Sequence, residues 1–209
     1  MSKLFTGKDS WNGGYFNLLL SFKTLSNKEF KNVINYMWKM PCFNGPFGYD
    51  NLEPINQKKI KIKIPDKIDK GIINYGTVKL SNNKIAPCKF YAYFIDDENK
   101  MDCFINISIP FGALEELKIF PIGSYPFGNK INHKKWIEEL SNFMFKISKI
   151  IFDFYKFKKG LMGLIIGDDY NFLSENNYQI PKDRWLSYLI NKNGKLKYYP
   201  QNVFSGHFS

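Results

Sequence analysis

The chain has 209 residues, a formal net charge of +11 and a hydrophobic content of 44%. These values predict a folded globular protein with a substantial core and exclude disordered and fibrous classes. The three cysteines (Cys42, Cys88 and Cys103) form no CxxC pair, so neither a disulfide framework nor a zinc site is expected. The N-terminal residues contain no signal-peptide core, and the most apolar segment carries a charge in every turn. We therefore expect a cytoplasmic protein without a membrane span.

The positive charge comes almost entirely from lysine. Arg184 is the only arginine among 30 basic residues, whereas proteins that bind phosphates or guanines by design favour the planar guanidinium group. Lysines alternate with isoleucines in 58–70, which predicts a half-buried strand with lysines on its outer face. A phosphate-binding ridge is the alternative interpretation of this segment. Nucleic acid is therefore a less favoured partner than protein.

The first third of the chain predicts a strand, a helix, a loop and a second strand. Residues 11–23 open with a glycine pair and continue with aromatic and aliphatic residues, which is typical of an interior strand. A helix over 26–40 follows, because Ser26 and Glu29 have the spacing of a capping box. Residues 41–54 are dense in proline and glycine and predict a structured loop before the 58–70 strand.

The rest of the chain predicts a sheet around one long helix. A three-stranded meander is expected over 72–109 and a short helix at 113–118. The polar residues of 134–157 form one narrow stripe, which predicts a long helix covered on most sides by strands, by the first helix or by a partner. A short interior strand is expected at 160–167, after a helix cap at Gly160, and a hairpin around NKNGK over 183–200.

These elements predict an α+β fold. The sheet is expected to be mainly antiparallel, or mixed, with about seven or eight strands, one long helix and one shorter helix. Since no polar linker divides the chain, residues 1–209 are expected to form a single domain.

Three short motifs carry a resemblance. They are WNGGY from Trp11, PIGSYPFG over 121–128 and RWLSYL over 184–189. Together they resemble an uncharacterised family of bacterial cytosolic proteins over about 11–200. The resemblance implies a single domain of bacterial or phage type, and it implies no activity, cofactor or catalytic residue.

Carboxylates are the candidate catalytic groups. Asp168 and Asp169 follow a predicted buried strand, where many folds place metal-binding or general-base acids, and Asp50 and Glu53 are possible partners. An ordinary turn is the simpler interpretation of the Asp pair. His133 lacks a serine or cysteine motif, so we expect it to be a capping or surface residue. The chain matches neither GxGxxG nor the Walker pattern, so no cofactor is expected.

Recognition is the better supported alternative, because rigid aromatics on ordered loops are usual material for binding surfaces. The candidate binding residues come from two Pro/Gly loops and one Arg–Trp pair: Phe47, Tyr49, Asp50, Glu53, Tyr125, Phe127, Arg184 and Trp185. In the competing interpretation the aromatics lie under the loops and close the ends of the sheet, and Arg184–Trp185 belongs to a strand.

The sequence therefore favours a soluble intracellular binding protein over an enzyme. Its expected partner is a protein, as for immunity-type or regulatory proteins, or a second copy of the chain. A metal-dependent hydrolase of phosphodiester bonds that uses Asp168 and Asp169 is the first alternative. A lysine-rich nucleic-acid-binding protein is the second.

Overall fold

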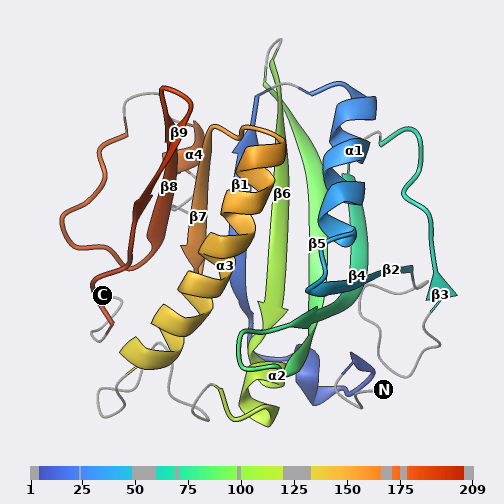
Figure 1. Ribbon diagram of the computed structural model, residues 1–209, viewed down its shortest axis with the longest axis vertical. Helices are drawn as coiled ribbons and strands as arrows, with labels where there is room; N and C mark the ends of the chain where they lie inside the picture. The colour runs from blue at the N-terminus through green and yellow to red at the C-terminus, as the bar shows by residue number, and fades with distance from the viewer. Residues whose placement is uncertain are drawn as a thin grey trace.

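An antiparallel sheet is the framework of the molecule (Figure 1). The structure, a computed structural model, describes residues 5–23, 25–48, 60–68, 71–97, 100–119, 133–165, 171–174 and 178–204. Within these residues the sheet has nine strands in the order β3-β2-β4-β5-β6-β1-β7-β8-β9, and each neighbouring pair is antiparallel. The predicted α+β class and antiparallel sheet are confirmed.

The strands are β1 (Tyr15–Phe22), β2 (Phe43–Gly48), β3 (Ile60–Lys61), β4 (Gly71–Lys79), β5 (Ile85–Asp97), β6 (Lys100–Pro110), β7 (Lys159–Gly163), β8 (Ser187–Lys192) and β9 (Lys195–Tyr199). The helices are the 3-10 turn η2 (Asp9–Trp11), α1 (Asn27–Trp38), α2 (Phe111–Glu116), α3 (Lys134–Phe154) and α4 (Asn171–Ser174).

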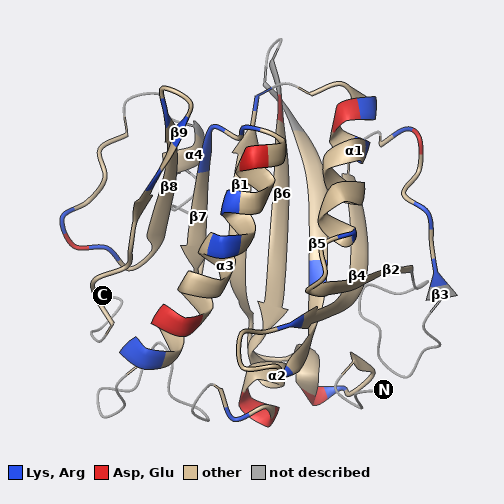
Figure 2. Ribbon diagram, viewed as in Figure 1, with Lys and Arg blue, Asp and Glu red and all other residues tan. Residues whose placement is uncertain are grey.

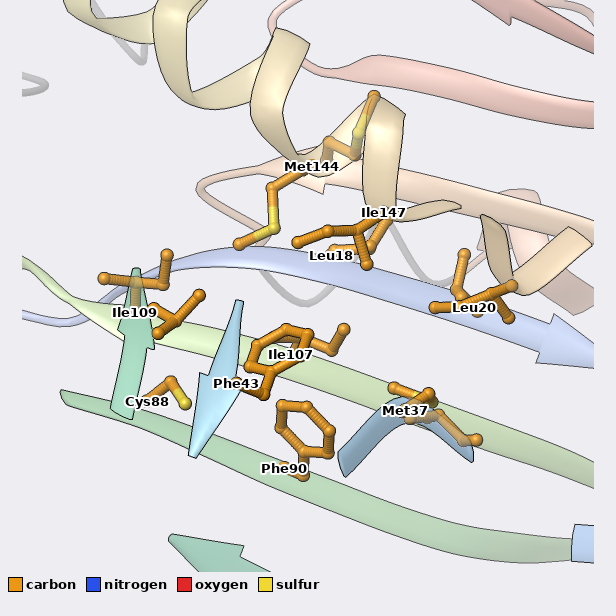
Figure 3. Close-up of a cluster of buried hydrophobic side chains, with 14 of the residues drawn as sticks. Leu18, Leu20, Met37, Phe43, Cys88, Phe90, Ile107, Ile109, Met144 and Ile147 are labelled. Atoms are coloured by element: carbon orange, nitrogen blue, oxygen red, sulfur yellow. The ribbon is translucent and has the colours of Figure 1, made fainter. Parts of the chain in front are cut away.

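The two longest helices, α1 and α3, lie side by side on one face of the sheet (Figure 1). Alternation along β1 directs Leu18 and Leu20 towards these helices, where both are fully buried. Met144 and Ile147 of α3 approach the same core from above (Figure 3). The capping box of α1 forms as predicted, with the Ser26 hydroxyl accepting from the Glu29 amide.

The other face of the sheet has a separate apolar cluster. Leu19 and Leu161 from the central strands pack there with Phe172 and Leu173 of α4 and with Tyr188 of β8. Helix α4 therefore covers part of this face over β1, β7 and β8. The central strands are consequently buried on both faces.

The indole of Trp38 fixes α1 to the sheet. It stacks on Phe90 of β5 at a centroid distance of 4.0 Å. A Cβ atom at Gly45 or at Gly76 would lie only 2.4 Å from the Trp38 ring, so the ring occupies the space that a side chain would need.

Several sequence predictions are confirmed. The meander corresponds to β4, β5 and β6, and β1 is an interior strand between β6 and β7. The β8–β9 hairpin turns at Asn193 and Gly194, whose φ angles of 53° and 77° allow the two-residue turn that suits the strand twist.

Three predictions are wrong in detail. Within 60–68 only Ile60 and Lys61 form a strand. Ile64 and Ile68 turn into the core instead, and the Ile68 amide donates to the Asn27 side chain of α1. The Pro/Gly loop contains a strand, β2, which pairs with β4 despite a register shift between Asn44 and Phe47.

The third error concerns the end of the long helix. It ends at Phe154, and Phe157 is fully buried against Phe22 and Phe152. Lys158 then donates from its amide to the Ser21 carbonyl, and Gly160 lies inside β7 and caps no helix. Burial of one more aromatic ring and pairing with β1 therefore outweigh the helical pattern of the last residues.

Candidate protein-binding surface

Helix α3 exposes apolar side chains along the edge that faces α1. Ile150 and Phe154 are 45% and 46% exposed, and their separation of four residues places them on one edge of the helix. Phe143 lies seven residues before Ile150 and shares this edge. Tyr36 of α1 stacks flat on Phe154, with ring centroids 3.8 Å apart and an interplanar angle of 4°. We call Tyr36, Ile150 and Phe154 the apolar edge.

A groove of about 370 Å³ lies on the same side of α3. Leu140 and Phe143 of α3 form one wall, and Leu80 and Ile119 contribute apolar atoms from the other side. Its remaining lining residues are polar: Ser81, Asn82, Glu139, Asn142 and Lys146. Since Lys146 is four residues before Ile150, the groove and the apolar edge follow one another along the helix.

The sequence of the β4–β5 turn explains the position of Leu80, which lines the groove opposite α3. Asn83 adopts a left-handed φ of 64°, and its amide donates to the Leu80 carbonyl at 2.9 Å. The Lys84 ammonium then donates to the carbonyl of Leu117, which ends α2. The turn is thereby tied to the segment that carries Ile119.

The end of α2 places Ile119 in the groove. Lys118 is left-handed, with φ 53°, and the Ile119 amide donates to the Leu114 carbonyl at 2.9 Å. This is the bonding pattern of a Schellman motif, in which the residue after the left-handed position makes an apolar contact with the helix. Ile119 is accordingly half-buried against the core.

The opposite edge of α3 is covered by β9. Phe145 stacks on Tyr198 with ring centroids 4.2 Å apart. Burial raises the pKa of the Tyr198 hydroxyl, and its hydrogen bond with Ser187 partly offsets this effect. Helix α3 therefore has one edge packed against its own chain and one edge open to solvent.

Two of the described thiols, Cys42 and Cys103, are poorly suited to nucleophilic chemistry. Burial raises the pKa of Cys103 to about 11 and also raises the pKa of Cys42, so both are protonated at neutral pH. His133 occupies the N-cap position of α3, as one of its two predicted roles requires, but its side chain makes no capping bond. It is buried, and its Nδ1 accepts a hydrogen bond from Trp136 Nε1 at 3.0 Å, so it is not a surface residue. In the described ranges no three His, Cys, Asp or Glu side chains lie close enough together to hold a metal ion.

The structure describes only some of the predicted site residues. Phe47 is buried in a cluster with Phe5, Trp11 and Tyr75, so it does not project as a binding residue. Tyr49, Asp50, Glu53, Tyr125, Phe127, Asp168 and Asp169 lie outside the described residues. Their roles, and the hydrolase that depends on Asp168 and Asp169, stay predictions.

Arg184 acts as a clamp within the chain. Its guanidinium donates to the carbonyls of Pro200, Pro181 and Lys182, and Asn202 donates to the same Lys182 carbonyl. Arg184 and its half-buried neighbour Trp185 both precede β8, so neither belongs to a strand. The guanidinium therefore holds two segments of the C-terminal region together.

The apolar edge was visible in the sequence only in general terms. The wide apolar surface of 134–157 predicted that part of the helix would need a cover, but it did not identify which part. The packing of α1 and β9 decides that, and it leaves Ile150 and Phe154 exposed. Leu80 and Ile119 had no sequence signal, because separate turns bring them to the groove.

Comparison with protein-family models and with curated proteins finds no match to this chain. The resemblance to a bacterial cytosolic family therefore stays a prediction. Among the described helices, none has both the length and the apolar character needed to cross a membrane.

Proposed function

We propose that this chain is a soluble intracellular binding protein without catalysis, whose partner is a protein, as for immunity-type or regulatory proteins. The apolar edge of α3 is the observation that carries the proposal. Ile150 and Phe154 expose nearly half of their surface beside a groove that is large enough for an apolar side chain. Aromatic and aliphatic anchors beside a pocket are the usual centres of protein interfaces.

The surroundings of the apolar edge suit an interface of ordinary composition. Glu139, Asn142 and Lys146 place polar groups at the groove, and exposed lysines continue along α3 (Figure 2). A central apolar anchor with a polar rim is the arrangement found in stable complexes. A partner that covers about 800 Å² of this side would cover both the groove and the apolar edge.

Affinity purification from lysate of the cells that make the protein tests this proposal. The tagged chain is expected to retain a partner in stoichiometric amount, and the variant Ile150→Glu/Phe154→Glu is expected to lose it. The control Lys8→Gln/Lys182→Gln changes the net charge by the same −2 at exposed positions outside α3 and should keep the partner. Absence of a stoichiometric partner would contradict the proposed function. Equal retention by both variants would place the interface elsewhere.

A further inference from the structure

The β8–β9 hairpin carries three lysines on one side. Lys192 and Lys195 are directly opposite each other, and Lys197 follows two residues after Lys195 on the same face of β9. All three are exposed, and in the part of the chain that the structure describes none of them forms an ion pair or a hydrogen bond. Like charges directly across a strand pair repel, so an anion near them would stabilise the hairpin.

Strand β9 forms one edge of the sheet (Figure 1). Because the hairpin turn has two residues, Lys192 and Lys195 exchange both backbone hydrogen bonds, and alternate residues of β9 do the same. Leu196 and Tyr198 therefore direct their N–H and C=O groups away from β8. No described residue bonds these outward groups.

We propose that the outer edge of β9 binds an extended acidic segment of a partner protein as an additional antiparallel or parallel strand. The backbone of Leu196 and Tyr198 supplies the pairing groups, and the three lysines select aspartate or glutamate at alternate positions of the added strand. Strand addition obtains affinity from main-chain hydrogen bonds and specificity from alternate side chains, and this edge offers both. This surface is separate from the apolar edge and does not depend on the function proposed for it.

The charge of the edge favours such a partner over a second copy of the chain. Two copies joined at β9 would bring Lys195 and Lys197 towards the same residues of the other copy. Lysines on edge strands commonly prevent this kind of self-pairing. An acidic strand reverses the effect, because each lysine then faces an opposite charge.

A peptide of alternating glutamate and valine, nine residues long, is the probe. Titration of the peptide into ¹⁵N-labelled protein should give saturable changes in the NMR chemical shifts of the hairpin amides. Hydrogen exchange of the Leu196 and Tyr198 amides should become slower when the peptide binds. The variant Lys192→Glu/Lys195→Glu/Lys197→Glu should bind about tenfold more weakly or worse. The control Lys23→Glu/Lys28→Glu/Lys39→Glu has the same charge change at exposed positions near α1 and should bind within about twofold of the wild type.

Two further ligands separate strand addition from simple attraction between charges. The same peptide with every backbone nitrogen methylated keeps its carboxylates but cannot donate, so its affinity should fall at least about tenfold. A (dT)12 oligonucleotide should bind more weakly than the peptide and leave the exchange of the two amides unchanged. The proposal is overturned if the peptide does not bind, if methylation has no effect, or if the oligonucleotide binds as well as the peptide. Peptide binding by Ile150→Glu/Phe154→Glu should be unchanged, so failure here and failure of the proposed function are distinguishable.

Discussion

Two residues of α1, Trp38 and Tyr36, form aromatic stacks of similar geometry and opposite exposure. Trp38 stacks on Phe90 at 4.0 Å and 22°, whereas Tyr36 stacks on Phe154 at 3.8 Å and 4°. Trp38 is 6% exposed and Phe154 is 46% exposed. The two pairs therefore differ in their exposure to solvent and not in the geometry of the ring contact. The first pair is enclosed by strands and glycines and fixes α1, while the second pair lies at the surface and remains available to a partner.

The largest effect expected from this comparison is on the enclosed stack. Phe90→Ala should lower the free energy of unfolding by about 3–5 kcal/mol, because the ring is fully buried between Trp38 and Phe43 and its removal leaves a cavity. Urea denaturation followed by tryptophan fluorescence measures this loss. A loss below about 1 kcal/mol would mean that the site collapses or that the stack contributes little.

The glycine beneath the indole gives a second, smaller effect. Gly76→Ala should cost about 1–3 kcal/mol, because its Cβ would lie 2.4 Å from the Trp38 ring and 2.8 Å from the Asn44 carbonyl oxygen. Repeating the substitution in a Trp38→Leu background is the control. The cost of the alanine should be smaller there because the shorter side chain can give way. An equal cost in both backgrounds would show that the Asn44 carbonyl, and not the indole, restricts position 76.

Local patterns in the sequence predict most of the strands of the sheet and the start of α1. The capping box of Ser26 and Glu29 located the start of α1, and the Asn193–Gly194 turn located the last hairpin. Alternation failed over 62–68, where Ile64 and Ile68 are buried as a strand would require but the backbone forms no strand. Burial patterns report which side chains face the core, and they do not report whether a neighbouring strand is present.

The candidate surface was less predictable because it depends on how separate elements are placed. Phe47 and Phe154 are both phenylalanines in apolar surroundings of the sequence, but one is buried and the other is half exposed. Only the positions of α1 and β9 decide which edge of α3 stays open. Exposure at this edge is a property of the assembled layer and has no local signature.

A small effect on stability is expected at the exposed stack. Phe154→Ala should lower the free energy of unfolding by less than about 1.5 kcal/mol, because about half of the ring is already in water. Phe152→Ala, two residues away on the same helix and 3% exposed, is the matched control and should cost about 3–5 kcal/mol. Similar losses for the two variants in urea denaturation would show that the exposed stack supports the fold, which would weaken its assignment as a binding surface.

The smallest effect concerns the polar contact between α1 and α3. The Ser26 hydroxyl and amide and the Tyr155 hydroxyl donate to the Glu29 carboxylate, and together they hold the pKa of Glu29 below its ordinary value. A carboxyl whose pKa is lower in the folded than in the unfolded state stabilises the fold above the unfolded pKa. This contribution is lost as the pH falls through the folded pKa.

The pH dependence of unfolding tests whether this contact behaves as a solvated one. Wild-type protein should lose stability as the pH falls below about 4.3, the ordinary glutamate value. Glu29→Gln, which keeps an acceptor for the cap, should lack that part of the loss. The two proteins should therefore differ slightly at pH 7 and converge at pH 3, as measured by urea denaturation at each pH. Tyr155→Phe removes only the donor from the α3 side and should flatten the profile less, because the two bonds from Ser26 have the larger influence on the pKa. Parallel wild-type and Glu29→Gln profiles would show that the carboxylate is not held in the folded protein. The hydrogen bonds from Ser26 and Tyr155 to Glu29 would then contribute little to the stability of the protein in solution.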